Sequence, residues 1–448
     1  MTKTVHPSTI SGSLSAAASK SVVQRLVALA SLADGQTTIR NVTLSDDVRA
    51  ALYIAESLGA KVHQEADAVI IDGMAFGRQK TSAGDSRTAG AAGAGVSEAC
   101  GPLTLDCGES GLSMRMFAPV AALFERDTML TGRGSLLKRP MFMIEESLRH
   151  FAVRVSSSDG HAPLSFRGPL CPARATIDGS ASSQLLSGLL IALPLLAEDS
   201  VLTIKAATSR PYLNLTLQAV SRFGGQIQQH NWQELVVQGG CTYTSPGVIP
   251  AEGDWSGAAF FLVAAALTGE LVMDNLVLQS CQGDKEIITA LRQAGALVEI
   301  AEASDNSGTA AIRIKQPASL QAFDFDATEC PDLFPPLVAL ASACNGISRI
   351  QGAGRLRHKE SDRASALSSE FGKLGIRVVC EGNLMTIHGG RPSAAAVQSH
   401  GDHRIAMAAA VAALRASGPV VIHGSEAVSK SWPAFFEDLV RLGVQIDE

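Results

Sequence analysis

The sequence predicts an α/β protein built from two domains with internal pseudo-symmetry. Three observations lead to this: the chain has 448 residues, one apolar stretch pattern recurs six times, and β-branched strand-like segments alternate with it. A chain of this length exceeds what one hydrophobic core normally serves, so two domains are expected. Six βαβαβ-like repeats, three in each domain, fit the pattern.

Each repeat opens on a small or acidic residue that can cap a helix, and an apolar stretch of about 12–15 residues follows. These first halves lie at 19–35, 109–124, 182–199, 253–269, 331–346 and 401–418. A second helix, amphipathic and ending near Leu-Gly, and a short strand complete the repeat. Such second halves lie at 48–62, 212–227, 285–300, 364–379 and 435–446.

The repeats, counted three and three, set the expected domain boundaries. One domain is expected at 19–247, and the other at 1–18 together with 248–448, because a Ser-Pro-Gly linker stands at 245–247. The first repeat is lengthened by a Gly-, Ala- and Ser-rich insertion at 77–101. Its AGAAGAG run is similar to a dinucleotide-binding loop, but no strand-turn-helix pattern frames it, so we expect a surface loop.

The bulk composition narrows the classes of partner. A net charge of −6 argues against nucleic acid or an anionic membrane, so any basic site is local. The eight cysteines form no CxxC pair and indicate reduced thiols of a cytosolic protein. The N-terminus lacks the apolar core of a signal peptide, and the longest apolar run, at 185–197, is too short to span a bilayer. We therefore expect a cytoplasmic protein.

Basic residues recur near the starts of the predicted helices. A cation there is unfavourable by about 0.3–1 kcal/mol, because a helix N-terminus carries partial positive charge. If the helix starts converge, their cations form a positive pocket for a small, multiply anionic ligand. Neutral donors at 182–184 and Ser209 suit phosphate oxygens and hydroxyls. The cations concerned are Lys20, Arg25, Arg115, Lys138, Arg139, Lys359, Arg363, Arg404 and Lys430.

Eight short blocks resemble, in order and spacing, the signature blocks of the 5-enolpyruvylshikimate-3-phosphate (EPSP) synthase family. They are ASKSVVQR, GESGLSMR, GSLLKRPM, SASSQLL, TSRPY, LRHKESDR, GDHRIAM and VSKSWP, and they span essentially the whole chain. The resemblance implies a two-domain inverse α/β prism with three repeats per domain and helix N-termini facing the interdomain cleft. It also implies that the domains close on their substrates.

The activity implied by this resemblance is a transferase step of the shikimate pathway, in aromatic amino acid biosynthesis. The enolpyruvyl group of phosphoenolpyruvate moves to the 5-hydroxyl of shikimate 3-phosphate through a tetrahedral intermediate, and phosphate is released. No metal or organic cofactor is implied, and we expect a monomer. Both substrates are multiply anionic, so many cations are needed to overcome their mutual repulsion.

The resemblance also assigns roles to individual residues. Asp332 matches the general base that takes the 5-hydroxyl proton, while Glu360, Lys20 or Lys430 would move the proton to C3 of phosphoenolpyruvate. Shikimate 3-phosphate would be bound by Ser21, Arg25, Ser182, Ser183, Ser209, Asp332 and Lys359. Phosphoenolpyruvate would be bound by Lys20, Gly111, Arg139, Gln184, Arg363, Arg404 and Lys430.

Three positions depart from the commonest family pattern. Ala18 stands where a glycine is usual, Glu109 where many bacterial members have asparagine, and Arg355 where many members have a second asparagine. A carboxylate and a cation at the last two positions are expected to alter anion affinity more than the reaction itself.

Three alternatives remain open at this point. A related UDP-N-acetylglucosamine enolpyruvyl transferase would share the fold, but that family carries a reactive cysteine in the loop at 132–141, where this chain has none. A metal site could use His400, Asp402 and His403. A non-catalytic, anion-binding relative is disfavoured because Lys20 and Asp332, with the other catalytic candidates, are all present.

Overall fold

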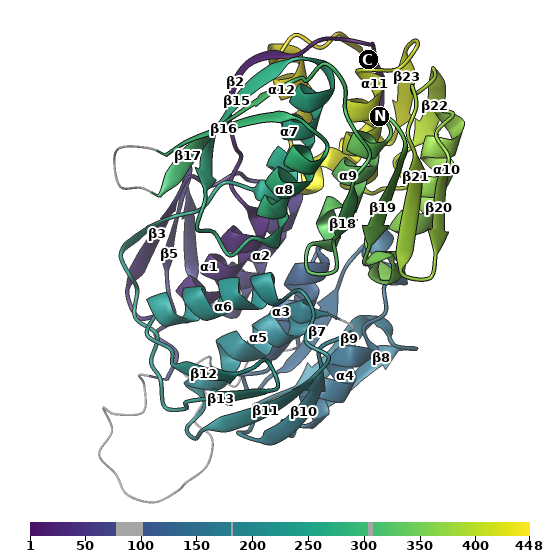
Figure 1. Cartoon of the computed structure of the whole chain (residues 1–448). Helices are drawn as coiled ribbons and strands as arrows, with labels where there is room; N and C mark the ends of the chain where they lie inside the picture. Colours follow the sequence, from purple (N-terminus) through teal and green to yellow (C-terminus); the bar gives the residue numbers. More distant parts are fainter. Residues whose placement is uncertain (78–101, 181, 303–307) are drawn as a thin grey trace, which may run out of the picture. The chain divides into compact units, whose positions relative to one another are not determined.

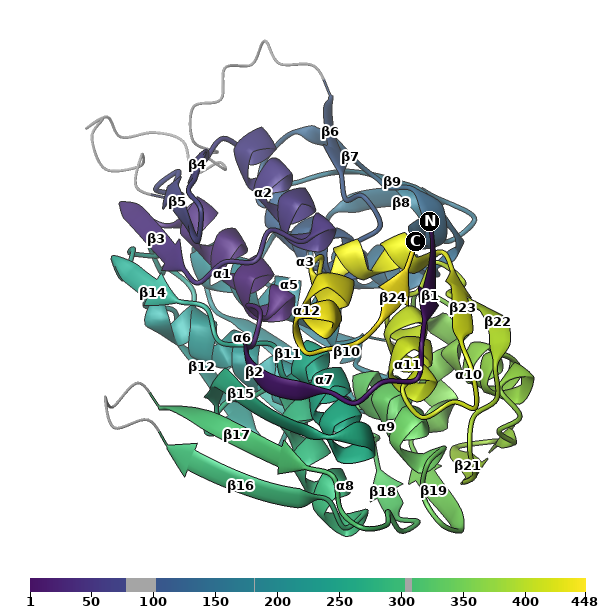
Figure 2. The same ribbon diagram turned by 90° about the horizontal axis from the view of Figure 1, so that it is seen from above.

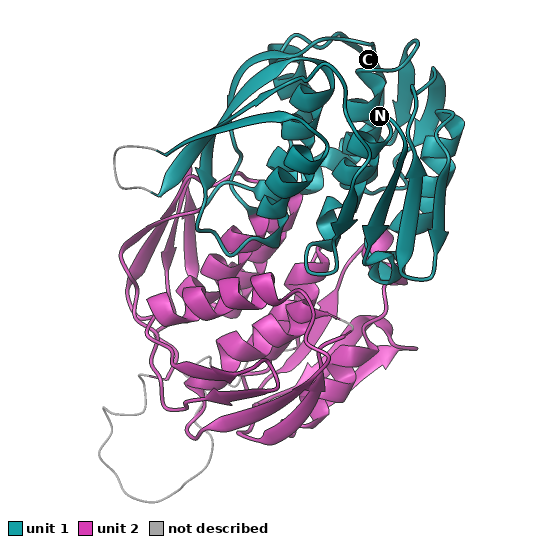
Figure 3. Cartoon of the chain, in the orientation of Figure 1, with its two compact units in different colours: residues 1–19, 252–448 teal, residues 20–251 magenta. Residues whose placement is uncertain are grey.

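The computed structural model describes residues 1–77, 102–180, 182–302 and 308–448. All but the first residue of the insertion expected to form a surface loop, 77–101, therefore lies outside the described residues. The chain divides into two compact units (Figure 3): unit 1 consists of Met1–Ser19 and Glu252–Glu448, and unit 2 of Lys20–Ala251.

Unit 2 contains six α-helices in its described residues. They are α1 (Lys20–Leu32), α2 (Asp46–Leu58), α3 (Gly111–Ala121), α4 (Phe142–Arg149), α5 (Ser183–Ala192) and α6 (Arg210–Arg222), with short 3-10 helices η2 (Gly134–Lys138) and η3 (Leu193–Leu195). Its strands are β3 (Gln36–Arg40), β4 (Lys61–Gln64), β5 (Ala68–Asp72), β6 (Leu103–Asp106), β7 (Asp127–Thr131), β8 (Arg154–Ser158), β9 (His161–Arg167), β10 (Arg174–Asp178), β11 (Ser200–Lys205), β12 (Ile227–His230), β13 (Glu234–Val237) and β14 (Val248–Pro250).

Unit 1 likewise contains six α-helices in its described residues. They are α7 (Trp255–Thr268), α8 (Ile287–Gln293), α9 (Phe334–Ala341), α10 (Arg363–Lys373), α11 (His403–Ala413) and α12 (Phe435–Arg441), with 3-10 helices η4 (Gly283–Glu286), η5 (Pro331–Leu333), η6 (Ala353–His358) and η7 (Ser425–Lys430). Its strands are β1 (Thr2–Val5), β2 (Ser11–Ser15), β15 (Glu270–Val277), β16 (Leu297–Glu302), β17 (Thr309–Lys315), β18 (Asp324–Asp326), β19 (Ile347–Gln351), β20 (Val378–Glu381), β21 (Leu384–His388), β22 (Ala395–Gln398), β23 (Val420–His423) and β24 (Ile446–Asp447).

The six four-stranded sheets formed by the described residues share one topology, which confirms the predicted repeat (Figure 1). In the sheet β10-β11-β13-β12, the first two strands are parallel and the remaining neighbours are antiparallel. A parallel pair needs a crossover connection, and the first helix of the repeat, here α5, supplies it. The second helix, here α6, then leads into the hairpin of β12 and β13.

The first helix of each repeat is buried, as its apolar sequence predicts. Every residue of α7 is buried, and α7, α9 and α11 pack on one another inside unit 1 (Figure 2). The second helices are amphipathic, so α10 buries only one face. In unit 2, α3 packs against both α1 and α5. The first helices therefore form each core, and only their ends can present functional groups.

The chain passes between the units at two places, and the parallel strand pairs explain how. Strand β2 precedes α1 in sequence but pairs in parallel with β15 of unit 1. Strand β14 precedes α7 but pairs in parallel with β3 of unit 2. Each crossing thus completes a sheet in the unit that it leaves. In unit 1 the Ser19 N–H donates to the Glu252 carbonyl over 2.8 Å, so the crossing segments run side by side directly before Lys20.

Candidate active site

The buried helices start differently in the two units. In unit 2, the hydroxyls of Ser110 and Ser182 cap α3 and α5. In unit 1, the carboxylates of Asp254 and Asp402 cap α7 and α11, and Asp332 lies in η5, the turn that leads into α9. A carboxylate neutralises the positive end of a helix, whereas a hydroxyl leaves it positive. Unit 1 can therefore hold cations at these ends, and unit 2 is better suited to anions.

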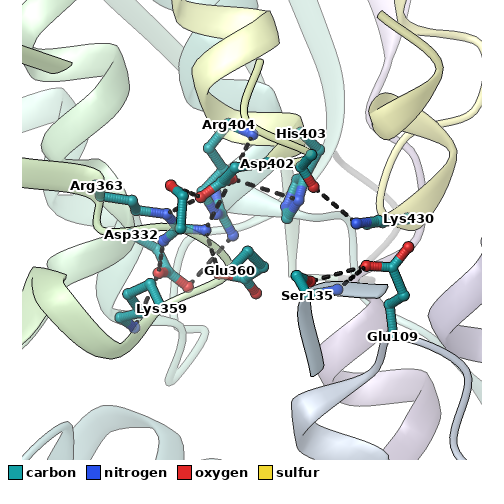
Figure 4. Close-up of polar contacts among 12 residues, drawn as sticks. Glu109, Ser135, Asp332, Lys359, Glu360, Arg363, Asp402, His403, Arg404 and Lys430 are labelled. Atoms are coloured by element: carbon teal, nitrogen blue, oxygen red, sulfur yellow. Dashed lines mark hydrogen bonds and ion pairs between the residues drawn. The ribbon is translucent and has the colours of Figure 1, made fainter. Parts of the chain in front are cut away.

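Asp332 lies at the centre of a cluster of charges in unit 1 (Figure 4). Its Oδ1 lies 2.7 Å from Nη1 of Arg363 and 3.1 Å from Nζ of Lys359, and its Oδ2 lies 3.3 Å from Nη2 of Arg404. Burial by itself would raise the pKa of Asp332, but Arg404, Lys359 and Arg363 more than offset it and hold the pKa well below its usual range. The carboxylate is therefore ionised in the free protein.

The pKa of Lys359 in the same cluster is also lowered, but here burial is the main cause. Burial lowers its pKa, and the neighbouring cations Arg363 and Arg355 add to this, although Asp332 partly counters them. Lys359 lies close to a helix start, as expected, but not in the helix itself. It follows η6 in an extended conformation, and α10 begins only at Arg363, because Asp362 caps it. Its ammonium group reaches Asp332 from a loop.

Arg363 joins Asp332 to two further carboxylates. Its Nη2 donates to Oε2 of Glu360 over 2.6 Å, and its Nε donates to Oδ2 of Asp402 over 2.8 Å. The side chains of Arg363 and Asp402 are only 1% and 0% exposed. Burial would lower the pKa of Arg363, but Asp402, Glu360 and Asp332 raise it well above its usual value. Arg363 therefore stays charged and links the three carboxylates of the cluster.

Arg404 and Lys430 reach this region from α11 and η7. The backbone N–H of Arg404 donates to Oδ1 of Asp402 over 3.0 Å, so the capping carboxylate fixes the position of the Arg404 backbone. Lys430 donates from Nζ to the Gly401 carbonyl over 2.7 Å, on the turn just before the cap. Both side chains are largely buried. Asp332, Lys359, Glu360, Arg363, Arg404 and Lys430, all predicted site residues, therefore lie in one connected network.

Lys20 opens α1 in unit 2 and forms a largely buried ion pair. Its Nζ lies 2.8 Å from Oδ2 of Asp47, and the two side chains are 13% and 11% exposed. Gln24, one turn along α1, donates to the Asp47 carbonyl and to the hydroxyl of Ser110. Asp47 was not identified from the sequence, because its pairing with Lys20 spans two different helices and leaves no local signal.

Arg25 is a buried cation held by neutral groups. Its Nε donates to Thr216 over 2.8 Å, Nη1 to the Ser21 carbonyl over 2.7 Å, and Nη2 to Ser187 over 3.2 Å. Burial lowers its pKa to about 10. Among the described residues no carboxylate forms an ion pair with it. Its positive charge is therefore available to an anion beside Ser21.

Two arginines lie at the start of α3. A Cβ added to Gly111 would clash with the guanidinium of Arg139 and would meet that of Arg115, so only glycine permits this approach. Nη1 of Arg115 donates to Oε1 of Gln184 over 2.9 Å, which joins α3 to α5. Arg139, Gly111 and Gln184 are therefore neighbours, as their shared predicted role requires. Arg115 was noted from its helix position but not placed in the site; it is the link among them.

The predicted serines lie at the starts of α5 and α6. The hydroxyl of Ser182 accepts the N–H of Gln184 over 3.2 Å, and Ser183 is the first residue of α5. Ser209 precedes α6 with a φ of 51°, in the left-handed region that non-glycine residues rarely adopt, and it is buried. Unusual backbone geometry of this kind concentrates at ligand-binding sites.

The departures from the family pattern have structural consequences. Oε2 of Glu109 accepts the backbone N–H and the hydroxyl of Ser135, each over 2.8 Å, and so ties the turn before α3 to η2 (Figure 4). Arg355 donates to the Thr328 carbonyl, and its charge helps to lower the pKa of Lys359. Ala18 pairs with Gly253 in an isolated antiparallel bridge. Ala18 and Glu109 each lie two residues before a predicted site residue, Lys20 and Gly111. Arg355 acts on a third, Lys359, through its charge.

Two of the three residues of the metal alternative pair with residues outside that trio. His400 lies 2.8 Å from Oε1 of Glu370, and Asp402 pairs with Arg363. Within the described ranges, no group of three or more His, Cys, Asp or Glu residues is arranged to hold a metal ion. None of the helices in the described part of the chain combines the length and hydropathy needed to cross a membrane.

Comparisons with known proteins agree with this geometry. The family model of EPSP synthase (3-phosphoshikimate 1-carboxyvinyltransferase) matches residues 5–104 and 93–439. The 3-phosphoshikimate 1-carboxyvinyltransferase of Clostridium botulinum strain Alaska E43 is 36% identical over 447 residues, which cover 99% of this chain and 98% of that protein. The enzyme of the same name from Aeropyrum pernix is 34% identical over 443 residues, covering 99% and 96%.

Solved structures support the same grouping. An EPSP synthase from Acinetobacter baumannii superimposes with a TM-score of 0.79 at 27% identity, covering 100% of both chains. The enolpyruvyl transferase NikO from Streptomyces tendae matches with a TM-score of 0.74 at 15% identity, covering 100% of this chain and 98% of that one, and shows likeness of fold alone. The predicted fold class is therefore confirmed.

Proposed function

The chain belongs to the EPSP synthase (3-phosphoshikimate 1-carboxyvinyltransferase) family, and we infer from this its reaction and the roles of its site residues. It transfers the enolpyruvyl group of phosphoenolpyruvate to the 5-hydroxyl of shikimate 3-phosphate and releases phosphate. The alternative UDP-sugar substrate is not favoured, because the relatives above bear the shikimate enzyme's name. The observation that carries the site assignment is the Asp332 carboxylate, ionised among three cations.

We propose that Asp332 is the base that accepts the 5-hydroxyl proton. A carboxylate whose pKa is held low is a weak base in the free protein. Substrate phosphate and carboxylate groups would compete for Lys359 and Arg404, and Asp332 would then lose part of its stabilisation. Its pKa would rise when the substrates bind, so the base becomes effective only in the loaded enzyme.

We propose the following ligands for the two substrates. Lys359, with Ser21, Arg25, Ser182, Ser183 and Ser209, would hold shikimate 3-phosphate. Arg363, Arg404 and Lys430, with Lys20, Gly111, Arg139 and Gln184, would hold phosphoenolpyruvate. Buried guanidinium groups suit carboxylates and phosphates because their fork of donors is rigid. This supports Arg139 and Arg404, which are 6% and 4% exposed.

For the proton at C3 of phosphoenolpyruvate, we propose Glu360, Lys20 or Lys430 as the group that moves it. Each is held by a specific partner: Glu360 by Arg363, Lys20 by Asp47 and Lys430 by the Gly401 carbonyl. A fixed donor at hydrogen-bonding distance is what general acid catalysis requires. Solvent-deuterium incorporation at C3 in single variants of the three residues would identify the group, because only its loss should suppress exchange.

We further propose a cytoplasmic monomer with the two domains expected from the sequence, 1–18 with 248–448 and 19–247. The compact units divide the chain one residue later at the first boundary and four residues later at the second. The seven cysteines in the described residues are all free, as is usual for cytosolic proteins. Light scattering of the purified protein would test the monomer, and a dimer mass would contradict it.

The function is tested by phosphate release with phosphoenolpyruvate and either shikimate 3-phosphate or UDP-N-acetylglucosamine. We expect turnover with shikimate 3-phosphate only. Preferential release of phosphate with the UDP-sugar would refute the assignment of substrate. Activity that disappears after removal of trace metals would revive the metal alternative.

A further inference from the structure

Residues 398–402, here called the α11 turn, connect β22 to α11 and bear on three predicted site residues. The Gly401 carbonyl accepts Nζ of Lys430 over 2.7 Å. Asp402 accepts the backbone N–H of Arg404 over 3.0 Å and Nε of Arg363 over 2.8 Å. A shift of this turn would therefore displace Lys430 and Arg404 together.

The α11 turn is held by Glu370, a residue to which the proposed reaction assigns no role. Glu370 lies in α10, and its side chain is 2% exposed. Its Oε2 accepts the backbone N–H of Gln398 over 2.9 Å, and its Oε1 lies 2.8 Å from Nε2 of His400. Lys373 donates to Oε2 over 2.6 Å from one turn further along α10. The Ser369 hydroxyl also donates to Oε1 over 3.2 Å, so one buried carboxylate collects four donors, two of them on the turn.

Side chains of α10 therefore contact the α11 turn at both of its ends. Arg363 and Glu370 are seven residues apart, which is about two turns of an α-helix, so they lie on the same face. Arg363 holds Asp402 at the C-terminal end of the turn, and Glu370 holds Gln398 at its beginning. Contacts of α10 with both β22 and α11 agree with this arrangement.

The backbone between these two anchors is strained. His400 has a φ of 54°, in the left-handed region, although it is not a glycine. Such conformations persist only where the surroundings impose them, and they concentrate at functional sites. The contact of the His400 ring with Glu370 helps to impose this conformation. The turn therefore has a defined shape that its own backbone preference would not maintain.

We propose that Glu370 is a positioning residue for the transferase reaction. By holding Gln398 and His400 it fixes the Gly401 carbonyl and Asp402, and through them it places Lys430 and Arg404 for phosphoenolpyruvate. The inference rests on the roles of Lys430 and Arg404 proposed above. Glu370 itself touches no predicted substrate ligand and is not a catalytic residue.

The test compares steady-state kinetics of Glu370→Gln with those of the unmodified protein. A glutamine side chain keeps the shape but has only one acceptor oxygen, so it cannot satisfy all four donors. We expect the KM for phosphoenolpyruvate to rise about fivefold or more, below the ~10²-fold loss that a 1 Å misplacement can cause. The KM for shikimate 3-phosphate should stay within about twofold. A purely structural role would lower the melting temperature and leave both KM values unchanged.

Two further variants keep the test decisive. Lys373→Met removes a charged donor of Glu370 that does not belong to the α11 turn, so it should leave the KM for phosphoenolpyruvate unchanged. His400→Ala removes a ring that is 41% exposed, so the variant should fold, and it should raise that KM as Glu370→Gln does. If Glu370→Gln does not fold, an unchanged KM in His400→Ala overturns the proposal.

Failure of this inference is distinguishable from failure of the proposed site. If Arg404→Ala raises the KM for phosphoenolpyruvate but Glu370→Gln and His400→Ala do not, only the positioning role is refuted. If Arg404→Ala also leaves that KM unchanged, the assignment of Arg404 fails and the positioning role falls with it. A KM increase in Lys373→Met equal to that in Glu370→Gln would likewise overturn the specific role of the α11 turn.

Discussion

Arg363 and Asp402 form a buried ion pair in which Nε lies 2.8 Å from Oδ2, with side chains 1% and 0% exposed. The pair joins the start of α10 to the cap of α11, so two repeats of unit 1 are fixed to each other at their functional ends. Asp402 also accepts the hydroxyl of Ser361 over 3.0 Å. Its carboxylate therefore combines helix capping, charge pairing and positioning of Arg404.

We expect Asp402→Asn to lower the free energy of unfolding by about 3–5 kcal/mol, because breaking a buried pair leaves Arg363 with less compensating charge. Urea denaturation followed by circular dichroism measures this. Asp362→Asn is the matched control, since Asp362 caps α10 at a partly exposed position and asparagine is an equally good cap. A loss as small as that of the control would mean that the pair contributes little to stability.

Asp332→Asn should remain folded and lose about 10²–10⁴-fold in kcat, the usual contribution of a general base. The KM for shikimate 3-phosphate should change little, because Lys359 and the other cations remain. Steady-state kinetics and a thermal melt of the same sample separate chemistry from folding. A stable variant with near-normal kcat would reduce Asp332 to a structural partner of Arg363.

Arg404→Ala should weaken binding of phosphoenolpyruvate by about 1.5–3 kcal/mol, the cost of losing a charge-assisted contact. The KM for phosphoenolpyruvate should therefore rise about tenfold or more. The kcat should fall less, because this contact exists in both the ground state and the transition state. Arg415→Ala serves as the control, because Arg415 lies two residues after the C-terminal end of α11. A variant that loses kcat alone would reassign Arg404 to the chemical step.

The pH dependence should differ between the free and the loaded enzyme. Arg404, Lys359 and Arg363 keep the pKa of Asp332 well below its usual range, against the effect of burial. Asp332 therefore stays ionised in the free protein at pH values down to about 4. Substrate anions should raise its pKa, so the acid limb of kcat should lie at higher pH than that of kcat/KM, after correction for titration of the substrate phosphates.

Coincident acid limbs in the two profiles would contradict this competition for cations. Phosphorus NMR titration of the free substrates supplies the correction. The alkaline side provides a second check on Lys359, since burial lowers its pKa. Binding of shikimate 3-phosphate should weaken as the pH rises through that lowered pKa, and Lys359→Arg, which stays charged, should retain binding at higher pH.

The repeat architecture was predictable from the sequence, because periodicity and capping are local properties. The apolar run after Asp254 predicts the buried helix α7, and Gly269 marks its end. Two of the motif blocks contain Glu360 and Arg404, and each of these residues lies close to a helix start. Local sequence therefore determined the elements, their order and the identity of the charged groups at their ends.

Only the tertiary structure decided which of these charged groups meet. Asp47 pairs with Lys20, and Glu370 holds His400, across stretches of chain that no local pattern connects. The strand exchange that pairs β2 with β15 and β14 with β3 likewise depends on contacts between distant segments. Charge pairing and strand pairing depend on distance in space, whereas periodicity and capping depend on distance along the chain. That is why the sequence determined the repeats and nominated the candidate site residues, and why the fold alone determined how their charges are partnered.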